Sequence, residues 1–190
     1  MLVTIAQTLI PAGVVLGQIG IVILLLALIF DSNGWLVQWV GKHAIWLATL
    51  FLLAAVGGSL FYSNVIGFEP CYLCWWQRIF IYPQLVLFVV ALWEQRSDLP
   101  RGGLTSGNEV FVYSLPLSII GALIAVYQIL LPYLAQAGID CGSSGPACTK
   151  LYVLAFGYVT IPVMSLTAFA IMILLAIASK INSKATSAAL

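Results

Sequence analysis

The chain has 190 residues, of which 63% are hydrophobic and only 7% are charged, and its formal net charge is +1. This number of charged side chains is too small to cover the surface of a water-soluble globule. The composition therefore predicts an integral membrane protein with one compact domain. The sequence contains no basic block, which argues against nucleic-acid binding.

The first two predicted spans lie on either side of a short polar break. Residues 2–30 contain no charged side chain, and residues 12–30 alone cross most of a hydrocarbon core of about 30 Å at about 1.5 Å per residue. A cleaved signal peptide is the alternative, but it needs a positive amino-terminal region, and the first cation here is Lys42. Residues 35–41 are expected along the membrane interface, and the second span covers residues 44–66.

Three further spans follow, separated by two polar segments. The third span is predicted over residues 75–93, a surface loop over 94–109, and the fourth span over 110–134. A second segment, containing several Gly and Ser residues and a Pro, leads to a last span over residues 151–179, which includes Pro162, and then to a short polar tail. The sequence therefore predicts an all-α membrane protein with five spans.

The charges in the loops orient these spans, because cytoplasmic loops of membrane proteins carry an excess of Lys and Arg. Five of the seven cations fall on one side of the predicted topology: Lys42, Arg96, Arg101, Lys180 and Lys184. That side is expected to be cytoplasmic, whereas Arg78 and Lys150 lie on the other side with all four cysteines. Disulfides form and persist outside the cytoplasm, so topology and cysteine placement agree.

A Cys-x-x-Cys pair, Cys71 and Cys74, stands at the start of the third span. This spacing is typical of a redox dithiol or of half a metal site. If Cys74 lies near the first turn of the span, the unpaired amides of the helix end stabilise its thiolate, which is the reactive form. A static disulfide that staples the loop, and a zinc site shared with the other two cysteines, are the alternatives.

Arg78 follows Cys74 by four residues. On a helix the two side chains would share a face, with about 5–6 Å between their β-carbons. An ionisable side chain at the rim of a span is a candidate functional group, and a guanidinium here would favour the thiolate and could donate to a carbonyl oxygen of an electron acceptor. The alternative is an arginine that extends toward lipid head groups. Trp75 and Trp76 are interpreted as aromatic anchors at the membrane interface.

The other two cysteines, Cys141 and Cys148, lie in a segment that contains two glycines and a proline between them. Such a loop suits a disulfide that is presented to a protein partner, although a plain disulfide that closes the loop is the alternative. Gln128, in the fourth span, is expected either to face a cavity or to bond a neighbouring helix.

At these residues the chain resembles the DsbB family of disulfide bond formation proteins, and more closely its BdbC-like branch. The resemblance covers roughly residues 44–180 and rests on residues 70–79 (PCYLCWWQRI), residues 120–122 with Tyr127, the Cys141 and Cys148 loop, and Phe156-Gly157 followed by residues 160–162. Vitamin K epoxide reductase homologues do related chemistry, but their loop cysteines precede the Cys-x-x-Cys pair. Here the Cys-x-x-Cys pair comes first, which favours the DsbB family.

The resemblance implies a four-helix transmembrane bundle over residues 44–180. Residues 1–43 would form an extra amino-terminal transmembrane segment and a cytoplasmic loop, and residues 181–190 a polar cytoplasmic tail. No metal is implied, and a monomer in contact with membrane lipids is expected.

The resemblance also implies a thiol:quinone oxidoreductase of the bacterial inner membrane. Such an enzyme reoxidises an extracytoplasmic thioredoxin-like (DsbA-like) thiol oxidant and passes two electrons to ubiquinone or menaquinone. Cys141 looks like the cysteine that forms the mixed disulfide with the partner, and Cys148 like its mate. Cys71 looks like the residue that exchanges with this pair, Cys74 like the thiolate that touches the quinone, and Arg78 like the family's arginine beside the quinone.

Two features depart from the family pattern. The residue after Tyr127 is often a histidine in the family and is Gln128 here, which leaves a side-chain proton donor at that place open. The span before Asp31 is extra to the usual four.

The alternative functions are a non-enzymatic scaffold or transporter subunit with structural or metal-binding cysteines, and electron flow in the reverse direction.

Overall fold

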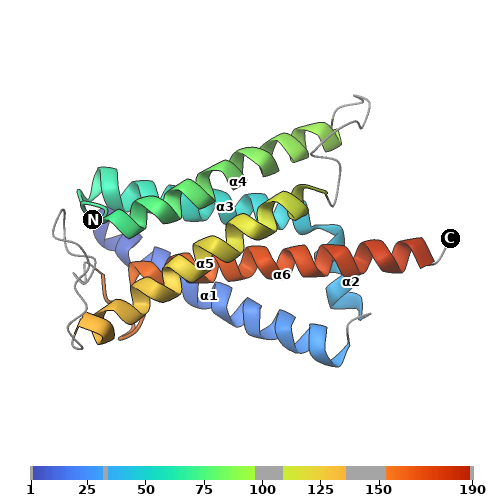
Figure 1. Cartoon of the computed structure of the whole chain (residues 1–190), viewed down its shortest axis with the longest axis horizontal. Coiled ribbons are helices and arrows are strands. Elements are labelled where there is room, and N and C mark those ends of the chain that lie inside the picture. The colour runs from blue at the N-terminus through green and yellow to red at the C-terminus, as the bar shows by residue number, and fades with distance from the viewer. Residues whose placement is uncertain (1, 32–33, 97–108, 136–152, 189–190) are drawn as a thin grey trace.

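The chain is a bundle of long helices in the computed structural model, which describes residues 2–31, 34–96, 109–135 and 153–188 (Figure 1). The elements in chain order are α1 (Leu2–Phe30), α2 (Trp35–Lys42), α3 (Ala44–Leu60), the π-helical turn η1 (Phe61–Val65), α4 (Tyr72–Arg96), α5 (Glu109–Ala135) and α6 (Ile161–Ala188). Within these ranges five helical segments are long and apolar enough to cross a membrane: α1, α3 with η1, α4, α5 and α6. The prediction of an all-α, multi-pass membrane protein is confirmed.

The apolar composition of these segments explains their helical form. In lipid, every backbone N–H and C=O group needs a partner within the protein, and a helix supplies one from the same segment. The spanning part of α4 has a mean hydropathy of 1.4, against 2.1 or more in the other four, because it carries Gln77, Arg78 and Gln84. Helix α4 therefore carries polar side chains well inside its membrane-spanning part.

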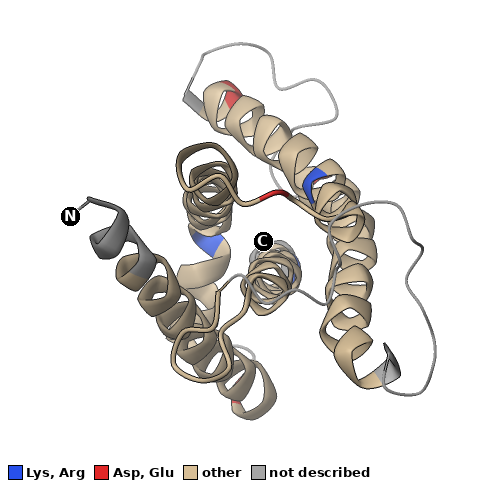
Figure 2. Cartoon of the chain, turned by 90° about the vertical axis from the view of Figure 1, so that its left-hand side faces the viewer, with Lys and Arg blue, Asp and Glu red and all other residues tan. Residues whose placement is uncertain are grey.

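Helix α6 is the centre of the bundle. It contacts α1, α2, α3 and α5, whereas α4 packs against α3 and α5. In the view along the bundle, the carboxyl-terminal helix lies between the other helices (Figure 2). Of the spanning part of α6, 44% is buried, against 6% of that of α1. Helix α1 is therefore peripheral, and most of its surface is expected to face lipid.

Aromatic rings and a polar cluster fill the contact between α4 and α5. Phe88 and Phe111 meet edge to face, with 5.0 Å between their ring centroids. The hydroxyls of Ser114 and Ser118 donate to the side-chain oxygen of Gln84 over 2.7 and 3.0 Å. Buried polar side chains within a membrane need such partners from neighbouring helices.

Gly121 allows α5 to approach α6 closely. A β-carbon at this position would overlap the ring of Phe169, which is fully buried. We therefore expect Gly121→Ala to lower the free energy of unfolding by about 1–3 kcal/mol, because the packed ring has no room to move away. Gly57→Ala is the matched control, since a β-carbon there meets nothing within 4 Å. Thermal unfolding of the purified variants measures both, and equal melting temperatures would contradict this account of the contact.

The last span begins at Ile161, so the prediction that it begins at residue 151 was wrong. The chain first makes a tight turn, in which the backbone groups of Ala155 and Val159 exchange hydrogen bonds of 3.0 and 2.9 Å. Phe156 and Gly157 have φ values of 53° and 79°, which a right-handed helix cannot accommodate. Pro162 consequently lies in the first turn of α6, where its missing N–H costs nothing, and α6 continues to Ala188 through residues predicted as a tail.

Candidate functional site

The dithiol lies where α4 begins. Cys71 directly precedes the helix, and its carbonyl oxygen accepts the first-turn bond from the Trp75 amide at 3.1 Å. Cys74 lies in that first turn, as predicted. The two sulfur atoms are 3.1 Å apart, and Cys71 is only 4% exposed. Only a small movement is needed for these two sulfurs to bond, while Cys71 stays shielded from solvent.

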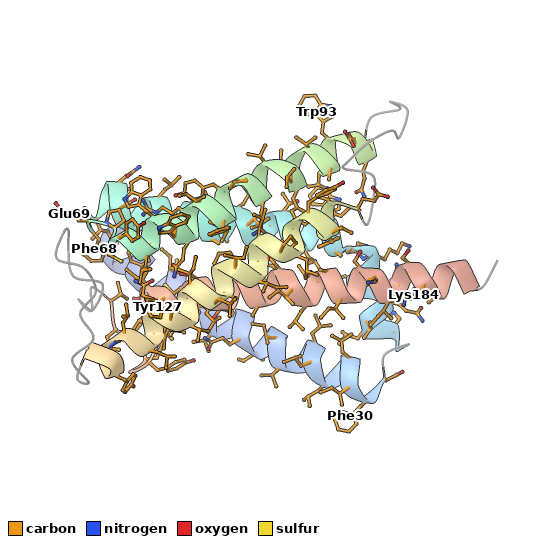
Figure 3. The ribbon with its side chains drawn as sticks, in the orientation of Figure 1. Phe30, Phe68, Glu69, Trp93, Tyr127 and Lys184 are labelled. Atoms are coloured by element: carbon orange, nitrogen blue, oxygen red, sulfur yellow. The ribbon has the colours of Figure 1, made fainter. Side chains whose placement is uncertain are left out.

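The chain reaches this position through a short connection after η1. Gly67 has a φ of 81°, a left-handed conformation that favours glycine. The Phe68 amide then donates to the Tyr62 carbonyl oxygen at 3.0 Å, and the two rings stack with centroids 6.0 Å apart. This turn fixes the point at which Cys71 enters α4. Phe68 and Glu69 lie at the end of the bundle opposite Lys184 (Figure 3).

Gln128 of α5 holds both sulfur atoms. Its side-chain nitrogen lies 3.3 Å from Cys71 Sγ and 3.4 Å from Cys74 Sγ, in position to donate to either. Its side-chain oxygen accepts from Gln77 Nε2 at 2.9 Å, and Gln77 Oε1 accepts from the Ser165 hydroxyl at 2.7 Å. A chain of side-chain hydrogen bonds thus joins α4, α5 and α6 behind the dithiol.

Gln128 is the site residue whose role the sequence left open. The prediction was that it would face a cavity or bond a neighbouring helix, and it does both, since it also lines the cavity described below. The sequence feature that could have indicated a polar contact was the presence of two glutamines in apolar spans, with Gln77 one helical turn after Cys74. The pairing itself joins residues 51 positions apart and was not visible in the sequence.

The glutamine pair gives a stability prediction. Replacing either Gln77 or Gln128 by Leu removes the hydrogen bond that joins the two buried amides. We therefore expect each variant to destabilise the fold and the double variant to be non-additive by about 0.5–1.5 kcal/mol. Unfolding of the four proteins of this double-mutant cycle measures the coupling. Leu130→Met, at a position that is 47% exposed, serves as the second mutation of a control cycle with Gln77→Leu. Additive effects in the glutamine cycle would contradict the proposed chain of bonds.

Arg78 is tied to α3. Its Nε donates to Ser59 Oγ at 3.1 Å and its Nη2 to the Ser59 carbonyl oxygen at 3.3 Å. The guanidinium carbon also lies 5.4 Å from the centroid of the Trp75 ring, within the range of a cation–π contact. These contacts fix the guanidinium against α3, whereas the alternative prediction had it extended toward lipid head groups. Ser59 was not among the predicted site residues, since nothing in its sequence surroundings predicts the contact.

A cavity of about 990 Å³ opens beside these residues. Most of its lining is apolar, and its polar lining residues include Cys71, Cys74, Gln77, Arg78 and Gln128. This volume lies at the upper end of the range of about 300–1,000 Å³ for small-molecule sites, which are typically apolar with a few polar groups. The cavity is therefore suited to an apolar molecule with a small polar group.

Tyr62 of η1 supplies a further polar group in the cavity lining. Its side chain is 5% exposed, and its hydroxyl has no hydrogen-bond partner among the residues that the structure describes. A buried hydroxyl without a partner carries a desolvation cost, which a ligand that accepts a hydrogen bond would offset. Together with Arg78, Tyr62 fits a ligand that has a carbonyl oxygen.

The remaining predicted site residues, Cys141 and Cys148, lie outside the described residues, as does Lys150. Their position relative to Cys71 stays a prediction. In the described ranges no group of three or more His, Cys, Asp or Glu side chains lies together as metal ligands would.

Comparison with known proteins identifies relatives over most of the chain. Residues 41–179 match the family model described as "Disulfide bond formation protein DsbB". The chain is 34% identical to a "Probable disulfide formation protein" of Chlamydia caviae over 70% of this chain and 89% of that protein. It is 35% identical to the "SPbeta prophage-derived disulfide bond formation protein B" of Bacillus subtilis over 71% and 85% of the two chains. It is 40% identical to a "Probable disulfide formation protein C" of Halalkalibacterium halodurans over 64% and 82%. No solved structure gives a significant match.

Proposed function

The chain belongs to the DsbB family of disulfide bond formation proteins, and from this premise we propose that it is a thiol:quinone oxidoreductase. It reoxidises an extracytoplasmic thioredoxin-like (DsbA-like) thiol oxidant and passes two electrons to a membrane quinone, either ubiquinone or menaquinone. The observation that carries the proposal is a dithiol, with Cys71 buried, that shares one apolar cavity with Arg78 and Tyr62. The Tyr62 hydroxyl has no hydrogen-bond partner in the part of the chain that the structure describes. A quinone has the apolar body and carbonyl oxygens that such a lining fits.

Electrons enter through the loop pair in this proposal. A thiolate of the reduced partner attacks the Cys141–Cys148 disulfide, which forms a mixed disulfide at Cys141 and releases Cys148 as a thiolate. The partner's second thiol then displaces Cys141, so the partner leaves oxidised and the loop cysteines remain as two thiols. Those thiols exchange with a Cys71–Cys74 disulfide, which restores the loop disulfide and reduces the pair at α4.

Electrons leave through the pair at α4. When Cys71 and Cys74 bond again, two electrons and two protons are released, and a bound quinone accepts them to become the quinol. Gln128 holds the two sulfurs at 3.3 and 3.4 Å, which keeps them together in the reduced form. The bonds from Arg78 to Ser59 orient the guanidinium, and a guanidinium fixed in this way can donate to a carbonyl oxygen of the acceptor. The lining of the cavity beside the sulfurs is mostly apolar.

The proposed sidedness places both cysteine pairs outside the cytoplasm of a bacterial inner membrane. Lys42 ends α2, and Lys180 and Lys184 lie in the last turns of α6, at the end of the bundle away from Glu69 (Figures 1 and 3). Because Lys and Arg are enriched in cytoplasmic segments, this distribution supports a cytoplasmic position for that end. The domain limits of 44–180 for the redox unit and 181–190 for a cytoplasmic tail remain part of the proposal.

Coupled turnover tests the proposed function. The purified chain, a reduced thioredoxin-like donor and ubiquinone are mixed in lipid vesicles, and donor disulfide and quinol are counted together. We expect one quinol for each donor disulfide, at a rate that depends on the chain. A scaffold or transporter subunit would leave its thiol count unchanged when quinone is added. Reduction potentials of the donor and of the quinone give the direction of net flow, and a donor disulfide that is more oxidising than the quinone would contradict it.

A further inference from the structure

Helix α1 forms part of the cavity that holds the dithiol. Its lining residues are Leu9, Ile10, Gly13, Val14 and Gly17, all from the half of the helix near the site. The family match begins at residue 41, so these residues lie outside the part of the chain that the family model describes. Figure 1 shows α1 beside α6 at the edge of the bundle. An element that is peripheral to the core thus supplies a wall of the site.

Specific contacts hold this half of α1 on α6. Gly17 allows close approach, because a β-carbon there would lie 3.2 Å from Ile171 Cδ1 and 3.6 Å from Thr167 Cγ2. Gln18 Nε2 donates to Thr167 Oγ1 at 3.2 Å, and Gln18 Oε1 accepts from the Tyr158 hydroxyl at 2.7 Å. These are polar side-chain bonds in a helix whose spanning part is only 6% buried. These bonds hold α1 against α6 at the level of the membrane where the cavity lies.

The cavity continues from α1 to α3. A β-carbon on Gly58 of α3 would lie 3.8 Å from Ile10 Cγ2, so the two helices face each other there. Cys74 and Arg78 line the same cavity of about 990 Å³. A cavity of about 150 Å³ is enough for a benzene ring, so a quinone ring would occupy only part of the volume. The residues that line the whole cavity include apolar side chains of α1, α3, α5 and α6.

We propose that α1 forms the wall of a binding site for the isoprenoid tail of the quinone. The inference rests on the proposed function, since the tail is attached to the ring that meets Cys74. A quinone whose ring lies between Cys74 and Arg78 must place its tail in the same cavity or lead it out through it. Helix α1 lines this cavity with the apolar side chains of Leu9, Ile10 and Val14. Helix α1 therefore raises affinity for tailed quinones relative to quinones without a tail.

Substitutions that place a larger side chain on the cavity-lining face of α1 test the proposal. Gly13→Leu adds a side chain at a cavity-lining position where a β-carbon meets nothing within 4 Å, so the helix can accept it. Gly20→Leu makes the same change in the same helix, also with nothing within 4 Å, at a position that is not among the cavity-lining residues. Equilibrium binding is followed by quenching of tryptophan fluorescence, with ubiquinone bearing a short isoprenoid tail as one probe and the tail-less duroquinone as the other.

We expect Gly13→Leu to weaken binding of the tailed quinone about tenfold, or about 1.4 kcal/mol, and to leave duroquinone binding within about twofold of wild type. Gly20→Leu is expected to change neither. Gln18→Leu removes the bonds to Thr167 and Tyr158 without filling the cavity, and it should weaken the tailed quinone alone to a smaller extent.

Three results would overturn the inference. Unchanged affinity for the tailed quinone in Gly13→Leu would mean that the α1 wall holds something else, such as a lipid acyl chain. Equal weakening of the binding of both quinones would mean that α1 contacts the quinone ring or that the substitution destabilises the whole fold. Equal weakening by Gly20→Leu would show a general effect of the substitution. Failure of the wild-type chain to bind either quinone is a separate result, and it would contradict the proposed function itself.

Discussion

Replacing Cys74 by serine is expected to abolish turnover of quinone by a reduced thioredoxin-like donor. Serine has nearly the same shape, so it preserves the first turn of α4, but its hydroxyl cannot form the disulfide with Cys71. Because removal of an essential nucleophile costs orders of magnitude in rate, we expect a fall on the order of a thousandfold or more. Quinol formation, followed by absorbance in lipid vesicles, measures the change.

A second variant locates the defect. The double replacement of Cys141 and Cys148 by serine should also stop oxidation of the protein donor, but it should leave quinone able to oxidise Cys71 and Cys74 directly. Cys74→Ser should behave in the opposite way, with one equivalent of donor oxidised by the loop disulfide and no further turnover. Sustained wild-type turnover in Cys74→Ser would contradict the proposed path of electrons.

Replacing Arg78 by methionine is expected to raise the KM for quinone about tenfold to a hundredfold, with little change in the KM for the protein donor. The variant removes the charged donor from the cavity and its bonds to Ser59. A hydrogen bond from a charged group contributes about 1.5–3 kcal/mol, which corresponds to an effect of this size. Steady-state kinetics with each substrate varied in turn measures both constants.

Arg78→Lys and Ser59→Ala separate charge from orientation. Lysine keeps the positive charge but cannot reproduce the planar group that contacts Ser59 through two nitrogens, so we expect an intermediate KM. Ser59→Ala retains the guanidinium and removes only the Oγ contact of 3.1 Å, so its effect should be the smallest. An equal rise in the KM for the protein donor, or no change in either constant with Arg78→Met, would contradict a role for Arg78 beside the quinone.

The membrane spans were predictable because each one depends on the residues of its own segment. A segment in lipid must satisfy its own backbone, so long runs without charge indicated helices wherever they occurred. The positions of Cys74 and Arg78 followed from helical spacing in the same way. The start of α6 was not predictable from hydropathy, because Leu151 and Tyr152 are as apolar as a span requires while Phe156 and Gly157 adopt left-handed backbone angles.

The partners within the site were not predictable, since they come from helices far apart in the sequence. Gln128 reaches the sulfurs from α5, and Ser59 reaches Arg78 from α3. The contribution of α1 to the cavity was also beyond the sequence, since its lining positions are apolar like the rest of that helix. Such contacts depend on how the helices are placed around α6, which hydropathy does not encode.

Single-turnover oxidation of the pair at α4 shows whether quinone takes its electrons from Cys71 and Cys74. The Cys141→Ser, Cys148→Ser protein is fully reduced, freed of reductant, and mixed with ubiquinone in the absence of oxygen. Quinol is then counted, and the remaining thiols are alkylated and mapped by mass spectrometry. We expect one quinol for each disulfide formed between Cys71 and Cys74. Quinone that stays oxidised, or quinol that forms while both thiols remain open to alkylation, would contradict it.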